Sequence, residues 1–303
     1  MSTPPSPFDR DSLWAKAKNF INRSFEALDD GDFPLAAMWA ALALELLGKS
    51  ALSNQNPCLV ADPSDDGLSL MIATGLSHDY TKAKSIQAKA VFSRCERAFQ
   101  PFSAQEADKI AKARNEELHS GMMPFDAIPN KDRWWERYWA QAIILVEAQD
   151  EDLDSFVGGN RASIVQGHLD NNRQHVQQYT ARRISAAEER WHQALATVEG
   201  AHALEMHLRT LPTYLLSLRA PVTCPACGNQ GTLAGEDVES SEIEADPEEG
   251  SAWEVVQVYP EIFECSNCGL TLEGQPYLAA AQLDKLISVE RDYEPVWDDY
   301  GND

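Results

Sequence analysis

The residues best suited to chemistry lie in segment 114–121, which reads Arg-Asn-Glu-Glu-Leu-His-Ser-Gly. Arg114 and His119 place a permanent cation and a titratable imidazole five positions apart. An imidazole titrates near neutral pH, so His119 could act as a general base or a general acid. A guanidinium donates paired hydrogen bonds to anions, so Arg114 could stabilise charge that develops on a reacting group. The pair is therefore suited to proton transfer beside an anion.

A single helix must position both side chains. The sequence predicts this helix over Ser103–Ser120, where Ser103 is a favourable N-cap and Glu106 completes a capping box. Gly121 is a natural C′ residue and is expected to stop the helix.

The geometry of that helix separates the two candidate groups. Asn115 and His119 are i,i+4 neighbours, so the amide could orient the imidazole. Arg114 lies roughly 140° around the helix axis from His119. Two copies related by a two-fold axis would bring both Arg and both His side chains into one cleft, which predicts a homodimer.

The pattern Arg114-Asn115-x-x-x-His119 resembles the signature of the HEPN superfamily, and the resemblance extends over roughly the first half of the chain, on to Pro124-Phe125. It implies an α-helical bundle over residues 10–152 and, for members with both residues, a dimeric, metal-independent ribonuclease. Other members are non-catalytic binding or toxin-partner domains. Glu45 interrupts an apolar run and is a further candidate in the cleft, with a place on the open edge of its helix as the alternative.

The resemblance implies cleavage of RNA by its own ribose 2′-OH, which the chemistry of this pair permits. His119 would transfer the proton and Arg114 would stabilise the phosphorane-like transition state, giving a 2′,3′-cyclic phosphate and a 5′-hydroxyl. DNA lacks the 2′-OH and would not be cut. We expect a bacterial toxin or defence effector that acts on tRNA or another structured RNA, with a regulatory protein partner. The alternatives are a non-catalytic scaffolding module, and a surface Arg with a His stabilised by the helix C-terminus.

Four of the six cysteines form two Cys-x-x-Cys-Gly turns, Cys224/Cys227 and Cys265/Cys268, separated by 37 residues. Four thiolates at this spacing suit tetrahedral Zn²⁺, and the paired turns resemble a zinc ribbon. Because all four ligands are thiolates, no position stays open for water, so the zinc is expected to be structural. The two remaining cysteines, Cys58 and Cys95, are expected to be packing residues.

The 303-residue chain carries a net charge of −23, which is concentrated near its end. Residues 220–303 hold 2 basic and 19 acidic side chains, whereas residues 160–219 hold 7 Arg and 5 acids. A polyanion would avoid the acidic quarter, which could instead repel bulk RNA, mask the cleft or bind a basic partner. No apolar run reaches the length of a membrane span and no signal peptide is evident, so a cytoplasmic protein without a membrane partner is expected.

The pattern along the chain predicts a mainly α protein: a helical bundle, a long helical arm and a small β zinc ribbon. The expected divisions are a disordered N-terminus 1–9, the bundle 10–152, the arm 153–219, the ribbon with an acidic insert 220–275, and a short helix with an acidic tail 276–303. The helices expected from periodicity and breakers are Asp11–Asp30, Pro34 to about Leu52, Leu68–Leu76, Ser85–Phe99, Ser103–Ser120, Asp132–Ala148, Ala162 to about Glu199, His202–Arg219 with a bend at Pro212, and Tyr277–Glu290. Ala252–Glu264 is expected to be a strand and Glu236–Gly250 a loop.

Overall fold

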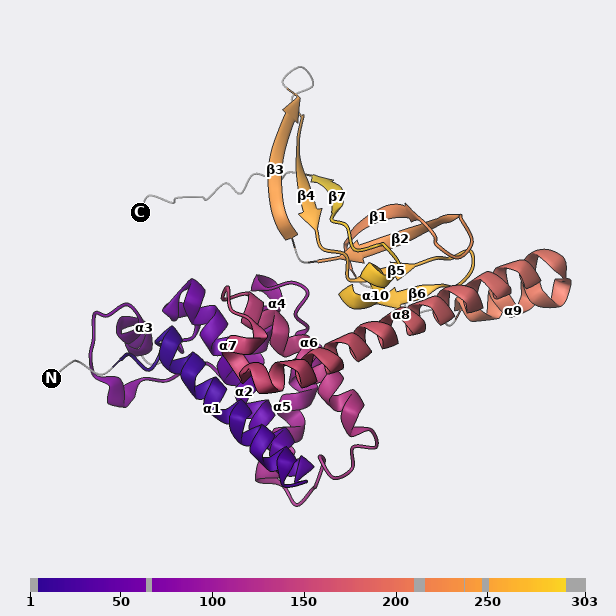
Figure 1. The fold of residues 1–303 in the computed structure, drawn as a ribbon. Helices are drawn as coiled ribbons and strands as arrows, with labels where there is room; N and C mark the ends of the chain where they lie inside the picture. Colours follow the sequence, from indigo (N-terminus) through magenta and orange to yellow (C-terminus); the bar gives the residue numbers. More distant parts are fainter. Residues whose placement is uncertain (1–4, 64–66, 210–215, 237, 247–250, 293–303) are drawn as a thin grey trace. The chain divides into compact units, whose positions relative to one another are not determined.

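The fold was analysed in a computed structural model, which describes residues 5–63, 67–209, 216–236, 238–246 and 251–292 (Figure 1). The chain forms two compact units, residues 1–173 and 174–303. The boundary lies inside one long helix, α8 (Gly159–Ala196), rather than at the predicted division after residue 152. The protein is mainly helical, with small antiparallel sheets in its C-terminal part, as the sequence predicted.

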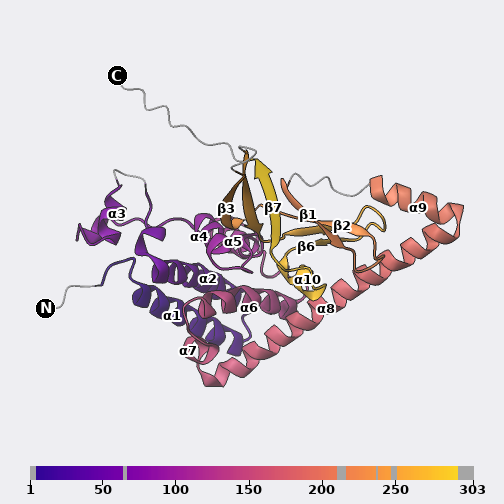
Figure 2. The same cartoon turned by 90° about the horizontal axis from the view of Figure 1, so that it is seen from above.

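The first unit is a helical bundle around α2 (Phe33–Gln55), which packs against its neighbours α1 (Arg10–Asp29), α4 (Ala88–Ala98), α5 (Ala104–His119) and α6 (Lys131–Glu147) (Figure 2). Asp32 caps the start of α2 by accepting from the Leu35 N–H, and Pro34 occupies the first turn. By length and composition, α2 could cross a membrane, but 67% of its most apolar stretch is buried inside the protein. It is the core helix that its apolar sequence predicted.

Short elements complete this unit: α3 (Leu68–Ala73), α7 (Leu153–Val157) and the 3-10 turns η1 (Pro57–Leu59) and η3 (Tyr80–Lys82). Folded structure begins before the predicted start at residue 10. Phe8 is fully buried, and its carbonyl accepts from the Ser53 hydroxyl, because the core of the bundle extends to this ring. The aromatic residues Trp135, Tyr138 and Trp139 of α6 are also buried in this core.

Helix α5 begins and ends where the sequence predicted, but the interactions at its two ends differ in part from the prediction. The Ser103 side chain accepts from the Glu106 N–H, so Ser103 is the N-cap. The second half of the capping box is absent, because the Ser103 N–H donates to Gln141 and the Glu106 carboxylate binds Lys109. Gly121 does not adopt a positive φ, and Ser120 leaves the helix in an extended conformation. Gly121 thus occupies the C′ position, as predicted, without a left-handed backbone.

In the second unit, α8 is followed by α9 (Val198–Arg209). The predicted helix His202–Arg219 is wrong at its end, because Leu218 and Arg219 belong to strand β1 (Leu218–Thr223), where they pair with β2. The predicted bend at Pro212 lies outside the described residues.

The strands form two antiparallel sheets (Figure 1). The first has the order β1-β2-β5-β6 and contains β2 (Gln230–Gly235), β5 (Ile262–Glu264) and β6 (Thr271–Glu273). The second has the order β3-β4-β7 and contains β3 (Val238–Asp246), β4 (Ser251–Val258) and β7 (Ile287–Asp292). The predicted strand 252–264 is thus two strands that belong to different sheets.

Two further predictions about this unit were wrong. Most of the acidic segment 236–250 was predicted to be a loop but is strand β3, which pairs with β4 at eight positions. The predicted helix Tyr277–Glu290 is a short α10 (Gln275–Ala280) followed by β7, because pairing with β4 overrides the local helical pattern. The predicted acidic tail after Asp292 lies outside the described residues.

Candidate functional site

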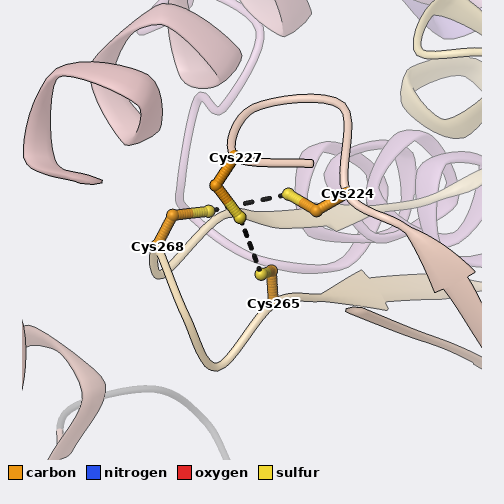
Figure 3. A group of neighbouring side chains, drawn as sticks. All are labelled: Cys224, Cys227, Cys265 and Cys268. Atoms are coloured by element: carbon orange, nitrogen blue, oxygen red, sulfur yellow. Dashed lines mark hydrogen bonds between the residues drawn. The ribbon is translucent and has the colours of Figure 1, made fainter. Parts of the chain in front are cut away.

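The four predicted metal ligands come from two equivalent turns (Figure 3). Cys224 and Cys227 lie between β1 and β2, and Cys265 and Cys268 lie between β5 and β6. In each turn the glycine that follows donates its N–H to the first cysteine carbonyl, at 3.0 Å for Gly228 and 2.9 Å for the second turn. Both glycines have positive φ, 72° and 71°. A Cβ would strain this conformation, which explains the glycine in each Cys-x-x-Cys-Gly.

The four sulfur atoms converge on one point, and all lie within 4.8 Å of one another (Figure 3). The Sγ atoms of Cys224 and Cys268 are 3.6 Å apart, as are those of Cys227 and Cys265. A tetrahedron with metal–sulfur bonds of about 2.3 Å has edges of about 3.8 Å. A disulfide needs a sulfur separation of about 2.05 Å. The separations therefore match four ligands around one metal ion.

The pKa values of three of these thiols are shifted by their neighbours and by burial. Hydrogen bonding by Cys268 lowers the pKa of Cys265 to about 4, whereas burial raises the pKa of Cys224 to about 11. The hydrogen bond to Cys265 also raises the pKa of Cys268. Without a metal, one thiolate thus forms at the expense of its neighbours, because like charges repel at this distance. A divalent cation would allow all four to deprotonate.

Two arginines of α8 brace the second turn, and the sequence had not identified this role. Arg190 donates from Nε to the Cys268 carbonyl at 3.3 Å and from Nη2 to the Gly269 carbonyl at 3.2 Å. Arg183 donates to the Thr271 carbonyl at 2.9 Å. Ala187, between them on the helix, is fully buried in the core that includes three of the four cysteines. The C-terminal half of α8 therefore shares a core with the cysteine cluster.

In the first unit, the structure brings together two of the predicted site residues, Arg114 and Glu45. Arg114 Nη1 donates to Glu45 Oε2 at 3.0 Å, which joins α5 to α2. Lys49 Nζ donates to the other carboxylate oxygen at 2.8 Å and to the Ser85 hydroxyl at 3.0 Å. Lys49 was missed by sequence reasoning, although its i,i+4 spacing from Glu45 is a signal for such a pair. We call Arg114, Glu45 and Lys49 the buried triad.

The buried triad contains two positive charges and one negative charge. Burial opposes ionisation of Glu45, but the two cations outweigh it and lower the pKa of its carboxyl. Two cations share one carboxylate, so the triad carries a formal net charge of +1. The Arg114 Nε is buried and has no hydrogen-bond partner. An unpaired buried donor costs free energy, so the guanidinium retains capacity for another acceptor.

The other two predicted site residues lie in a different environment. Asn115 and His119 are exposed, and neither side chain forms a hydrogen bond within the described part of the chain. The predicted orientation of the imidazole by Asn115 is therefore absent from this structure. His119 belongs to the last turn of α5, where a protonated imidazole interacts favourably with the helix dipole. Comparison of the chain with protein-family models, curated proteins and solved structures finds no match.

Proposed function

We propose that the chain is a metal-independent endoribonuclease of the HEPN type that acts as a homodimer, as a bacterial toxin or defence effector. One observation carries the proposal. The Arg-Asn-x-x-x-His motif lies at the C-terminal end of a bundle helix, with Arg114 anchored to Glu45 of the central helix and His119 exposed. The buried triad fixes the cation in place, and the exposed imidazole is accessible to a substrate.

In the proposed reaction, His119 accepts the proton of the ribose 2′-OH as this oxygen bonds to phosphorus. The P–O5′ bond breaks, and the His119 of the partner copy protonates the leaving oxygen. Arg114 stabilises the charge on the non-bridging oxygens by donating hydrogen bonds to them. The Arg114 side chain is 11% exposed, so the phosphate has to compete with Glu45 for the guanidinium.

Exposed apolar side chains beside His119 support pairing of two copies. Leu118, Met122 and Met123 are 48%, 56% and 67% exposed. Burial of these side chains against a second copy would supply a hydrophobic contact next to the two-fold axis. Replacement of Met122 and Met123 by Lys should then give a monomer in light scattering, whereas the unchanged protein should be a dimer at micromolar concentration.

The metal in this proposal is Zn²⁺, held by the four cysteines in a structural role. Four thiolates complete the tetrahedron and leave no site for a reactive water. Ribonuclease activity is therefore expected to be independent of added metal and to persist in EDTA for times too short to remove the zinc.

The test is incubation of the purified protein with tRNA and with DNA of the same sequence. The unchanged protein should cut RNA only and leave a 2′,3′-cyclic phosphate. His119→Ala should lower the rate by ~10²–10⁴-fold and Arg114→Ala by ~10²–10³-fold. His192→Ala, at an exposed His in the other unit, is the matched control and should retain full activity. A requirement for Mg²⁺, or equal cleavage of DNA, would contradict the mechanism.

One observation favours a second function, a non-catalytic binding or scaffolding module that acts with a regulatory partner. Arg114 is buried and already paired with Glu45, as in a structural ion pair. Expression in a bacterial host separates the two functions. Growth arrest by the unchanged protein but not by His119→Ala supports the ribonuclease, whereas equal growth with both supports the binding module.

A further inference from the structure

Helices α1 and α2 lie side by side and hold two aromatic rings together at their shared surface (Figure 2). The ring centroids of Phe20 on α1 and Trp39 on α2 are 5.2 Å apart, and the ring planes are tilted by 51°. Both side chains are half-buried. Phe20 packs against the core of the bundle, whereas Trp39 lies outside that core. The indole is therefore held against a neighbouring ring at the surface of the helical unit.

Two cations lie over these rings. The guanidinium carbon of Arg23 is 4.9 Å from the centroid of Trp39 and 6.0 Å from that of Phe20. Lys16 Nζ is 5.8 Å from the centroid of Phe20. Lys16, Phe20 and Arg23 are spaced by four and three residues, so they share one face of α1. We call these three residues and Trp39 the aromatic platform.

The positive charge of the aromatic platform has no carboxylate partner among the described residues. Within that part of the chain, neither Lys16 nor Arg23 forms an ion pair or a hydrogen bond through its side chain. Glu26 follows Arg23 by three residues, a spacing that permits an ion pair, yet the guanidinium lies over the rings instead. Both cations are exposed. The platform therefore combines two available positive charges with two rings, in a chain whose net charge is −23.

We propose that the aromatic platform binds single-stranded nucleic acid, with adjacent phosphates at Lys16 and Arg23 and one base stacked on Trp39 or on the guanidinium above it. Aromatic rings and guanidinium planes stack on the flat faces of unpaired bases, and cations beside them pair with the backbone. Carboxylates of an acidic peptide would pair with the two cations but would leave the rings without a stacking partner. The combination of groups therefore favours a nucleic acid over an acidic protein segment.

The aromatic platform is close enough to the proposed catalytic residues to act on the same strand. Trp39 and Glu45 are six residues apart on α2, which corresponds to about 9 Å along the helix axis. Glu45 in turn accepts from Arg114 at 3.0 Å. A strand cleaved beside Arg114 could therefore place a nearby unpaired base on Trp39. The inference rests on the proposed function for the identity of this strand as RNA, whereas binding is measured without cleavage.

The probe is a fluorescent 2′-O-methyl oligoadenylate of about 12 nucleotides, which attack by a 2′-OH cannot cleave. Anisotropy is measured on the full chain between about 50 mM and 200 mM NaCl. The oligonucleotide should bind at low salt, and an abasic strand of the same length and charge should bind about tenfold more weakly. Absence of binding at low salt, or equal binding of the abasic strand, would overturn the proposal. A peptide of alternating Glu and Ser that binds as tightly would assign the surface to a protein partner and overturn it as well.

Matched variants separate the aromatic platform from general electrostatic attraction. Lys16→Gln with Arg23→Gln should weaken oligonucleotide binding about tenfold at low salt. The slope of log affinity against log salt should become shallower by about 1.4, because each phosphate contact on a single strand contributes about 0.7. The control, Lys89→Gln with Arg97→Gln, removes the same charge from exposed positions of α4 and should change binding less than about twofold. Equal weakening by both double variants would contradict a defined site.

A third comparison tests the indole ring. Trp39→Leu keeps an apolar side chain on α2 and should weaken binding about tenfold, whereas Trp39→Phe keeps a ring and should weaken it less than about threefold. Circular dichroism and thermal unfolding show whether each variant is folded. Photocrosslinking of the unchanged protein to the oligonucleotide with one 5-iodouracil base needs no variant, and the adduct should map to Phe20 or Trp39. Crosslinks that map only to other parts of the chain would overturn the proposal.

Cleavage of tRNA by the unchanged protein is scored separately, so the two proposals fail in different ways. Binding that depends on Lys16, Arg23 and Trp39, without any cleavage of tRNA, would support the aromatic platform and contradict the ribonuclease. Cleavage of tRNA, together with oligonucleotide binding that none of these variants weakens, would support the ribonuclease and overturn the platform.

Discussion

Replacement of Glu45 by Ala should destabilise the helical unit strongly, because it leaves two cations of the buried triad without their shared carboxylate. The side chains of Arg114 and Lys49 are only 11% and 10% exposed, so water would solvate them poorly. Removal of one partner from a buried ion pair costs about 3–5 kcal/mol. The Glu45 side chain is 18% exposed, so water partly screens the triad and the expected loss in free energy of unfolding is at the lower end, about 3 kcal/mol.

The loss should depend on pH in a defined direction. The pKa of Glu45 is lowered in the folded protein from its ordinary value of 4.5, so the unfolded chain binds the proton more readily. The carboxylate therefore contributes stability above about pH 4.5, and this contribution disappears as the pH falls through the folded pKa. The difference in free energy of unfolding between the unchanged protein and Glu45→Gln should shrink between pH 7 and pH 3.

Urea unfolding followed by tryptophan fluorescence is a suitable assay, because Trp134, Trp135 and Trp139 report on the helical unit. The control is Lys112→Ala, which breaks an ion pair whose lysine side chain is 71% exposed and should not change stability measurably. Replacement of Glu45, Arg114 and Lys49 together by Leu should recover much of the loss, since an apolar set needs no compensation.

A loss below about 1 kcal/mol for Glu45→Ala would contradict the reasoning, because surface pairs typically contribute that little. A stability difference from Glu45→Gln that grows as the pH falls would contradict the assigned direction of the pKa shift.

Three further predictions concern packing and the metal. Removal of metal by a chelator, or Cys265→Ser, should unfold the sheet β1-β2-β5-β6, because metal binding and folding are coupled at such sites. The helical unit should keep its circular dichroism. Metal analysis should find one ion per chain in the unchanged protein. Arg190→Gln should weaken metal affinity about tenfold in a competition titration, whereas Arg182→Gln, at an exposed position of the same helix, should not. Gly48→Ala should lower the free energy of unfolding by about 1–3 kcal/mol, because the new Cβ would lie 2.9 Å from Val91 Cγ1.

Local signals predicted the helical unit well. Pro34 marks the first turn of α2, and the nearly all-apolar run that follows is typical of a central helix. Such features work because a cap or a helix-compatible proline acts within a few residues of its own position. The cysteine ligands were equally predictable, since each Cys-x-x-Cys-Gly is a local turn.

Contacts between distant residues were not predictable from sequence. The spacing of Arg114 and His119 predicted that they lie on different sides of α5, but only packing made Arg114 buried and His119 exposed. Sixty-nine positions separate Arg114 from Glu45, and no local pattern joins them. The roles of Arg183 and Arg190 depend likewise on carbonyl groups that follow them by 78 to 88 positions.

Strand pairing decided the acidic part of the chain. Segment 238–246 is rich in Glu and Ser and has no strong strand pattern, and segment 287–290 was predicted as helix. Both became strands because β4 lies between them and satisfies their backbone groups. Sequence alone therefore determined the two cysteine turns, the central helix and the extent of α5, through interactions within one or two turns. Tertiary structure determined the buried triad, the arginine brace and the pairing of β3 and β7 with β4, because each requires partners that are close only after folding.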